Sequence, residues 1–262
     1  MYSFEIERPA TVEEAVKALR IEEAMPLAGG QTLIPTLKQR LAMPSVLVSL
    51  SGISAIRGIC TDDAGRLCIG AGTTHAEIRD GASGFAGLSE MAANVGDPAV
   101  RNRGTIGGSL ANNDPSACYP AAVLGSGATV MTDRREIAAD DFFQGMFDTA
   151  LEENEIITEV RFPVPSKSGY SKFEQPASRF ALVGAFVAKF TDGVRVAITG
   201  ASESGVFRWR EAEEALAANF DAASIKNLSV PAEGMIGDLH GTPEYRAHLV
   251  AVMTRRAVRD AK

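Results

Sequence analysis

The amino-acid sequence predicts an α+β fold in two domains, on the basis of three observations. Residues 1–56 alternate strand-like and helical patterns in a compact βαβαβ-like unit. Two apolar runs flank Asp192-Gly193, and this arrangement is a signal for an antiparallel hairpin. Between these parts, Pro163 and Pro165 with Ser166-Lys-Ser-Gly169 break the pattern and indicate a linker.

The first unit opens with a strand at residues 3–6 and a helix whose start is marked by Thr11. Thr11 and Glu14 have the spacing of a capping box. The helix carries an apolar stripe formed by Val12, Ala15, Val16 and Leu19. A second helical stripe, before a buried strand at residues 46–50, is formed by Leu33, Ile34, Leu37 and Leu41.

The middle of the chain predicts both strands and helices. Residues 59–71 alternate around Asp63-Ala-Gly65, which indicates a hairpin. The remaining patterns predict, in chain order, a helix after Thr73-Thr74, helices at 85–94 and 119–124, and strands at 128–132 and 156–162.

The last third of the chain predicts the hairpin strands at 182–190 and 194–199, followed by helices at 209–219 and 243–259. The apolar stripe of the last helix is formed by Tyr245, Leu249, Val252, Met253 and Ala257. Its basic end suits the helix dipole.

Composition and charge exclude several classes of protein. The net charge is −7, whereas a nucleic-acid-binding surface needs a basic face. No apolar run approaches the ~20 residues of a membrane span, and the N-terminus lacks the apolar core of a signal peptide. We therefore expect a cytoplasmic protein.

The cysteines and histidines predict no metal site. Cys60, Cys68 and Cys118 include no C-x-x-C pair, and the three histidines show no metal-ligand spacing. A 2Fe–2S cluster normally needs four thiolates, so this chain is not expected to hold one by itself.

Two glycine-centred loops are the most informative feature of the sequence. The first glycine loop is Ala28-Gly29-Gly30-Gln31-Thr32, and the second is Arg103-Gly104-Thr105-Ile106-Gly107-Gly108-Ser109, each next to an apolar run of strand type. Glycine lets the backbone approach a ligand and lets N–H groups converge on an anion. Together the loops could hold a diphosphate from both sides, although a Gly-Gly pair can also be a plain turn. Neither loop matches a P-loop or a G-x-G-x-x-G fingerprint.

Three separated stretches of the chain resemble a known family. They are residues 27–41 with 46–50, residues 95–111 with Asp114-Pro115, and residues 237–250 with 253–256. In these stretches the chain resembles the FAD-binding medium subunit of the molybdenum hydroxylases, a group that includes xanthine dehydrogenase and aerobic carbon monoxide dehydrogenase. It is most similar to the carbon monoxide dehydrogenase type.

The resemblance implies a two-lobed FAD-binding domain of the PCMH (vanillyl-alcohol oxidase-like) type at residues 1–165, with lobes at about 1–56 and 57–165. It further implies a smaller C-terminal α+β domain at residues 168–262, with an antiparallel sheet and helices. The implied cofactor is FAD, bound between the two lobes.

The resemblance also implies which residues contact FAD. The backbone amides of both loops would receive the diphosphate, at Ala28, Gly29, Gly30, Gln31, Thr32, Thr105, Ile106, Gly107, Gly108 and Ser109. Thr32 could instead be only a helix N-cap. Arg101, Arg103 and Lys38 could offset phosphate charge or could simply be solvated at the surface.

Four further positions belong to the implied site. Val95 and Ile157 stand where the family places residues near the flavin, with core packing as the alternative. Phe180 stands where carbon monoxide dehydrogenase-like subunits carry a tyrosine, so it keeps the ring and loses the hydroxyl. Cys118 replaces an acidic residue that contacts sugar or ribityl hydroxyls in many relatives.

The implied function is electron transfer, with no catalytic acid, base or nucleophile on this chain. A large partner subunit would carry a molybdenum cofactor, and a small one would carry two 2Fe–2S clusters, in a dimerised heterotrimer. Electrons would pass from the clusters through FAD to an external acceptor. The alternatives are a stand-alone flavin-dependent oxidoreductase and a non-catalytic assembly homologue that has lost FAD.

Overall fold

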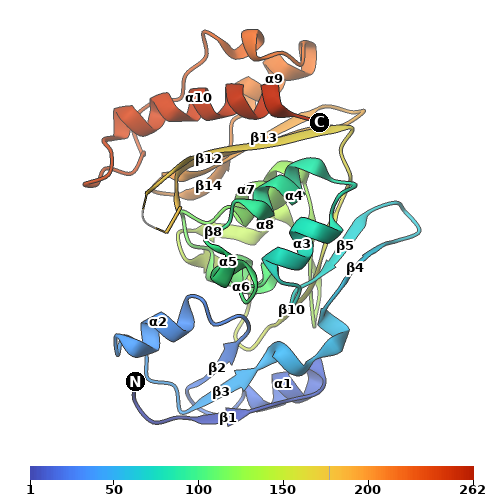
Figure 1. The fold of residues 1–262 in the computed structure, drawn as a ribbon, viewed down its shortest axis with the longest axis vertical. Coiled ribbons are helices and arrows are strands. Elements are labelled where there is room, and N and C mark those ends of the chain that lie inside the picture. The colour runs from blue at the N-terminus through green and yellow to red at the C-terminus, as the bar shows by residue number, and fades with distance from the viewer. Residues whose placement is uncertain (177) are drawn as a thin grey trace.

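Three layers of secondary structure follow one another along the long axis of the computed structural model, which describes residues 1–176 and 178–262. We call them the N-terminal lobe (1–56), the middle layer (57–165) and the C-terminal layer (167–262). Figure 1 shows the N-terminal lobe at the bottom and the C-terminal layer at the top. In the described part of the chain, no helix is both long enough and apolar enough to cross a membrane.

The N-terminal lobe is a three-stranded parallel sheet in the order β1-β3-β2, which confirms the predicted βαβαβ unit. Its elements are β1 (Glu5–Glu7), α1 (Val12–Ala18), β2 (Ala24–Leu27), α2 (Leu33–Lys38), β3 (Val46–Ser49) and the 3₁₀ turns η1 (Leu50–Gly52) and η2 (Ser54–Ile56). Thr11 caps α1 by accepting a 3.2 Å hydrogen bond from Glu14 N–H. The Glu14 carboxylate reaches back to Ala10 N–H, one residue before the N-cap.

The middle layer contains an antiparallel sheet in the order β4-β5-β10-β6-β7. These strands are β4 (Ile59–Thr61), β5 (Leu67–Gly70), β6 (Thr129–Thr132), β7 (Glu136–Ala138) and β10 (Ile157–Phe162). The other elements are α3 (His75–Gly81), α4 (Ala86–Ala93), α5 (Pro98–Arg101), α6 (Ile106–Asn112), α7 (Tyr119–Ser126), α8 (Ala139–Phe142), β8 (Phe143–Gly145) and β9 (Asp148–Thr149). The second glycine loop therefore starts after α5, and its last four residues form the first turn of α6.

The C-terminal layer is an antiparallel sheet whose strands follow one another in chain order. They are β11 (Lys167–Glu174), β12 (Ala181–Lys189), β13 (Val194–Ser202) and β14 (Gly205–Arg208), followed by α9 (Arg210–Ala218), η3 (Ala222–Ile225) and α10 (Pro243–Asp260). The predicted hairpin at Asp192-Gly193 is confirmed, because β12 and β13 pair around it.

The predicted linker is shorter in the structure, because Lys167, Ser168 and Gly169 already belong to β11. The small residues Ser168 and Gly169 serve close packing rather than flexibility. The Ser168 hydroxyl accepts a 2.9 Å hydrogen bond from Gly87 N–H in α4. A Cβ on Gly169 would lie 3.1 Å from the carbonyl carbon of Ala257 in α10. The sequence pattern is therefore that of a strand between two closely packed helices.

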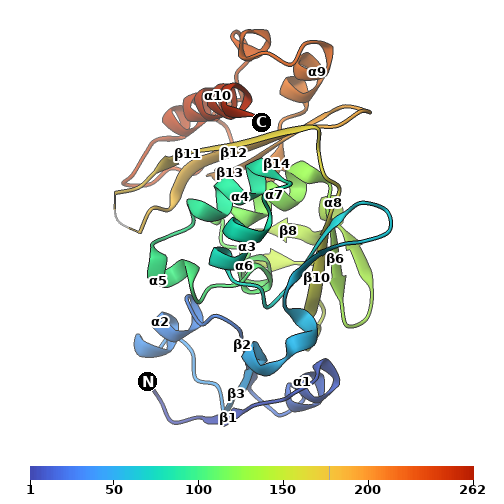
Figure 2. The same ribbon diagram turned by 45° about the vertical axis from the view of Figure 1, so that its right-hand side comes forward.

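The sheet of the C-terminal layer is covered on both faces (Figure 2). Helices α4 and α7 pack on the face toward the middle layer, and α10 packs on the other. Phe186 of β12 is fully buried and belongs to the same apolar cluster as Phe85 and Phe162 of the middle layer. The two predicted domains therefore share a core across their boundary, and the division at residues 165 and 168 stays a prediction.

The buried face of α10 differs in part from the predicted stripe. Leu249, Met253 and Ala257 are buried as expected, but Tyr245 is 40% exposed. Arg246 is buried instead, and it donates to the carbonyl oxygens of Leu182 at 2.8 Å and Gly200 at 2.6 Å. Its other terminal nitrogen pairs with the Asp238 carboxylate at 2.7 Å. Residues 237–250, part of the third stretch that resembles the family, thus contain a buried arginine whose hydrogen bonds hold α10 against the sheet.

We expect Arg246→Met to lower the free energy of unfolding by about 3 kcal/mol, because it leaves two carbonyl oxygens and a carboxylate without their donor. Urea unfolding followed by circular dichroism measures this change. The matched control is Arg256→Met on the exposed side of the same helix, which should change stability by less than about 0.5 kcal/mol. Equal effects of the two substitutions would contradict an anchoring role for Arg246.

Candidate cofactor site

The first glycine loop connects β2 to α2, with residues 28–30 half-buried and residues 31 and 32 exposed. Gly30 has a φ of +71°, a conformation that glycine adopts without strain. In the part of the chain that the structure describes, the N–H groups of residues 29–32 have no hydrogen-bond acceptor. Thr32 is the N-cap residue of α2, but its side chain makes no capping bond. The loop therefore offers a row of free donors and a free hydroxyl to a ligand.

The second glycine loop uses most of its own donors. Ile106 N–H donates to Thr73 at 3.2 Å and Gly107 N–H donates to Ala71 at 2.9 Å. Gly108 N–H donates to the Thr105 hydroxyl, and Ser109 N–H donates to the Thr105 carbonyl, at the start of α6. Within residues 1–176 and 178–262, the Ser109 hydroxyl has no partner. The backbone amides at 106–109 thus hold the loop in place. Among the described residues, the predicted donors of this loop that stay without a partner are the Thr105 N–H and the Ser109 hydroxyl.

The two loops touch one another through backbone atoms. A Cβ on Gly29 would lie within 2.7 Å of both the Arg103 carbonyl carbon and Gly104 Cα. A Cβ on Gly108 would lie 3.6 Å from Ala28 Cβ. These two loops, far apart in the sequence, therefore form one continuous surface, and their close approach requires a residue without a side chain at position 29.

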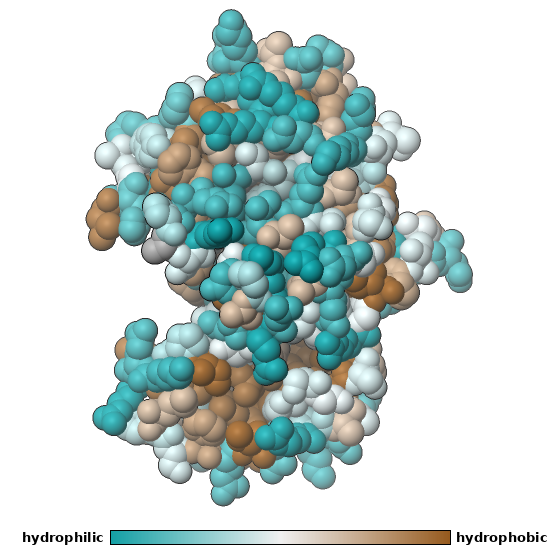
Figure 3. Space-filling view, viewed as in Figure 1, coloured by the Kyte–Doolittle hydropathy of each residue, from teal (hydrophilic) through white to brown (hydrophobic). Residues whose placement is uncertain are grey.

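This surface lies at the junction of the N-terminal lobe and the middle layer. Figure 1 shows α2 facing α5 and α6 there, and Figure 3 shows the molecular surface hollowed between the same two parts. The structure therefore brings the ten predicted loop residues together at one cleft.

Beneath the second loop lies a buried histidine that sequence reasoning passed over. A Cβ on Gly104 would lie 2.6 Å from His75 Nε2, so the loop rests directly on the ring. Burial, assisted by the nearby charge of Arg101, lowers the pKa of His75 from 6.5 to about 4. The imidazole is therefore neutral at pH 7. The only sequence signal was its position directly after the Thr74 N-cap.

Arg101 faces inward rather than toward the loop surface. Its terminal nitrogen donates to the carbonyl oxygens of Val95 at 3.1 Å and Gly96 at 2.9 Å. Arg101 therefore shapes the turn that carries Val95. A role for its charge in offsetting phosphate stays a prediction.

The four remaining predicted residues lie at different depths. Ile157 begins β10 and is 6% exposed within the core cluster of the middle layer. Cys118 is 6% exposed at the start of α7, and Val95 follows α4 at intermediate exposure. Phe180 precedes β12 and is 52% exposed. Lys172 of β11 contacts Cys118 and the residues that directly precede Val95 and Phe180.

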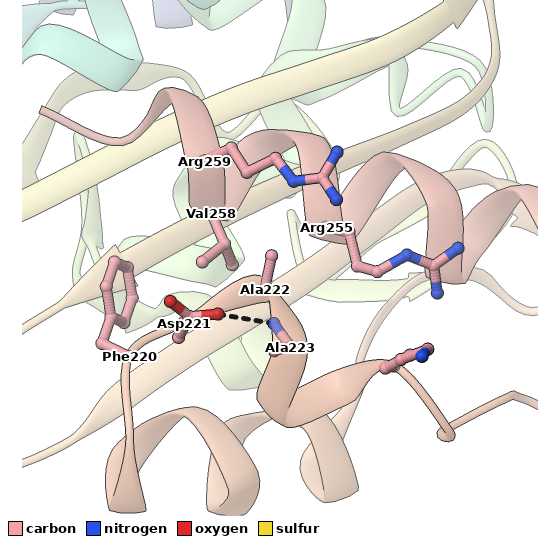
Figure 4. Close-up of a pocket in the computed structure, with 8 residues that line it drawn as sticks. Phe220, Asp221, Ala222, Ala223, Arg255, Val258 and Arg259 are labelled. Atoms are coloured by element: carbon pink, nitrogen blue, oxygen red, sulfur yellow. Dashed lines mark hydrogen bonds between the residues drawn. The ribbon is translucent and has the colours of Figure 1, made fainter.

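A separate pocket of about 770 Å³ lies in the C-terminal layer, between η3 and α10. Figure 4 shows Arg255, Val258 and Arg259 of α10 above Ala222, with Asp221 Oδ1 accepting from Ala223 N–H. This pocket lies on the side of the sheet away from the glycine loops, so it is distinct from the cofactor cleft. The residues that the structure describes contain no group of three or more His, Cys, Asp or Glu side chains that could hold a metal ion.

Comparison with known proteins shows the family. Residues 2–165 match the model of the FAD binding domain in molybdopterin dehydrogenase. The carbon monoxide dehydrogenase medium chain of Afipia carboxidovorans is 33% identical over 280 residues, covering 99% of this chain and 97% of the relative. The nicotine 6-hydroxylase medium subunit of Paenarthrobacter nicotinovorans is 34% identical, covering 97% and 95%.

A solved structure of reconstituted CO dehydrogenase from Oligotropha carboxidovorans matches the fold with a TM-score of 0.87 and 31% identity, covering 99% of this chain and 97% of the other. The predicted α+β class, the family resemblance and FAD as the cofactor are thereby confirmed. The chain belongs to the family of FAD-binding domains of molybdopterin dehydrogenases, as the FAD-binding medium subunit of an oxidoreductase.

Proposed function

We propose that this chain transfers electrons from 2Fe–2S clusters on a partner subunit, through its FAD, to an external acceptor. A bound flavin supplies the redox chemistry, and the protein supplies placement and electrostatics. The observation that carries the proposal is the joint surface of the two glycine loops, on which the N–H groups of 29–32 have no acceptor among the described residues. Such a surface fits the diphosphate that joins the two halves of FAD.

The residues present fit this cofactor. The N–H groups at 29–32 would hold the diphosphate, with the hydroxyls of Thr32 and Ser109 as further donors. The small surface of Ala28, Gly29 and Gly108 admits close approach to the backbone. Val95, Ile157 and Phe180 would bound the flavin half, and Cys118 would stand near its sugar or ribityl hydroxyls.

The partners we propose are a small subunit with two 2Fe–2S clusters and a large subunit with a molybdenum cofactor, in a dimerised heterotrimer. The relatives are named as medium chains or subunits, which supports an assembly of several chains. The chain has three cysteines, of which Cys68 and Cys118 are buried. Four thiolates are the usual cluster ligands, so clusters have to be supplied by another chain.

We expect the purified chain to bind FAD and to depend on its partners for reduction. The test is the visible absorption spectrum with added FAD, in which flavin bands near about 370 and 450 nm should persist through desalting. Carbon monoxide or nicotine, the compounds in the names of the two relatives, should leave these bands of the isolated chain unbleached, whereas dithionite should bleach them.

Two results would contradict the proposal. A chain that takes up no FAD would be an assembly homologue without its cofactor. Bleaching by one of these substrates in the absence of partners would identify a stand-alone flavin-dependent oxidoreductase.

A further inference from the structure

Lys172 of β11 joins three segments that are distant in the sequence. Its ammonium donates to the carbonyl oxygen of Asn94 at 2.6 Å and to that of Arg179 at 2.7 Å. The Cys118 sulfur lies 3.8 Å from the same nitrogen. The three contacts come from the end of α4, the approach to β12 and the start of α7.

Each contact lies at or beside a residue of the proposed flavin site. Asn94 directly precedes Val95, Arg179 directly precedes Phe180, and Cys118 is itself a proposed contact. Figures 1 and 2 show the end of β12 nearest Phe180 on the same side of the molecule as α5. A single side chain therefore connects the middle layer to the part of the C-terminal layer that carries the Phe180 ring.

Lys172 makes charge-assisted hydrogen bonds to two backbone carbonyl oxygens. Hydrogen bonds from a charged donor are shorter and stronger than those between neutral groups. In the described part of the chain, no carboxylate lies within 4.0 Å of the Lys172 ammonium. The two backbone carbonyls are thus its main partners, so its charge serves to hold these two backbone segments.

Resting on the proposed placement of the flavin, we propose that Lys172 is a positioning residue that sets Val95 and Phe180 on either side of the isoalloxazine ring. It acts on the flavin half of FAD and leaves the diphosphate half to the glycine loops. Loss of the ammonium releases the segment before Phe180 while the loop surface at Gly29 and Gly108 stays intact.

The test compares Lys172→Met, which keeps the stem and removes the charge, with Lys172→Arg, which keeps charged donors. Lys167→Met is the matched control, because Lys167 is an exposed lysine of the same strand. We expect Lys172→Met to raise the FAD dissociation constant about tenfold and to change the visible circular dichroism of bound FAD. Lys172→Arg should restore both quantities in large part, and Lys167→Met should leave them at wild-type values.

ADP, which carries the diphosphate without the flavin ring, separates positioning from general damage. Its affinity should be unchanged by Lys172→Met, and an equal loss of ADP and FAD binding would overturn the proposal. Wild-type FAD affinity together with wild-type visible circular dichroism in Lys172→Met would overturn it as well. If the methionine variant does not fold, Lys172→Gln takes its place in the same comparison.

A double variant tests whether Lys172 acts on the flavin through the position of the Phe180 ring. Phe180 is half exposed, so Phe180→Ala can be made with little risk to folding. In that background, Lys172→Met should change the visible circular dichroism of FAD much less than it does with Phe180 present. Fully additive effects would contradict positioning of the ring by Lys172. A wild-type chain without FAD binding would instead refute the proposed function.

Discussion

Gly29→Ala is expected to weaken FAD binding by at least about a hundredfold, or about 2.7 kcal/mol. The added methyl group would lie within 2.7 Å of the Arg103 carbonyl carbon and Gly104 Cα, so backbone on both sides has to move. The two glycine loops then separate, and the free donors at 29–32 lose their alignment with the second loop. Titration of the chain with FAD, followed by flavin fluorescence, measures the loss.

The control for Gly29→Ala is Gly52→Ala in the same lobe. The nearest described atom to a Cβ on Gly52, beyond the adjacent residues and its own 3₁₀ turn, would be the Pro9 carbonyl oxygen at 3.5 Å, which is an ordinary contact. This variant should bind FAD like the wild type, and both variants should keep the far-ultraviolet circular dichroism of the fold. FAD affinity that survives Gly29→Ala would show that the contact between the loops does not form the site.

Phe186→Ala is expected to lower the free energy of unfolding by about 4 kcal/mol, as large-to-small changes in a core do. The ring is fully buried and packs edge-on against Phe85, with centroids 5.9 Å apart. Because Phe85 belongs to the middle layer and Phe186 to the C-terminal layer, the substitution should destabilise both. Urea unfolding measures the change, and Phe147→Ala, at a ring that is 62% exposed, is the control.

The shared core also predicts how the chain unfolds. Trp209 is the single tryptophan and is buried in the apolar cluster of the C-terminal layer. Its fluorescence and the far-ultraviolet circular dichroism of the whole chain should therefore report one coincident transition. Two separated transitions would mean that residues 168–262 are an independently folding domain, and Phe186→Ala would then shift only one of them.

Much of the secondary structure could be predicted because its causes are local. The cap at Thr11, the hairpin turn at Asp192-Gly193 and the apolar period of α10 depend only on residues a few positions apart. β11 could not be predicted, because its small residues match a linker in composition. They are small because α4 and α10 approach the strand there.

The cofactor site also has features that the sequence predicts and features that depend on contacts between distant segments. The residues of both glycine loops could be named from the sequence, but not which of their donors are free, because the acceptors at Ala71 and Thr73 belong to another segment. Likewise, Arg101 and Lys172 are ordinary surface cations in the sequence. Their roles depend on carbonyl oxygens that only the folded backbone brings near them.

By itself, then, the sequence determined the family, the cofactor and most helices and strands of this protein. These properties depend on short motifs and on the periodicity of apolar residues. The tertiary structure alone decided that Gly29 meets Arg103, that Phe186 completes the core of another layer, and that one ammonium holds Asn94 and Arg179 together. Contacts of this kind join residues distant in the chain, and no local pattern encodes which distant backbone atoms will become neighbours.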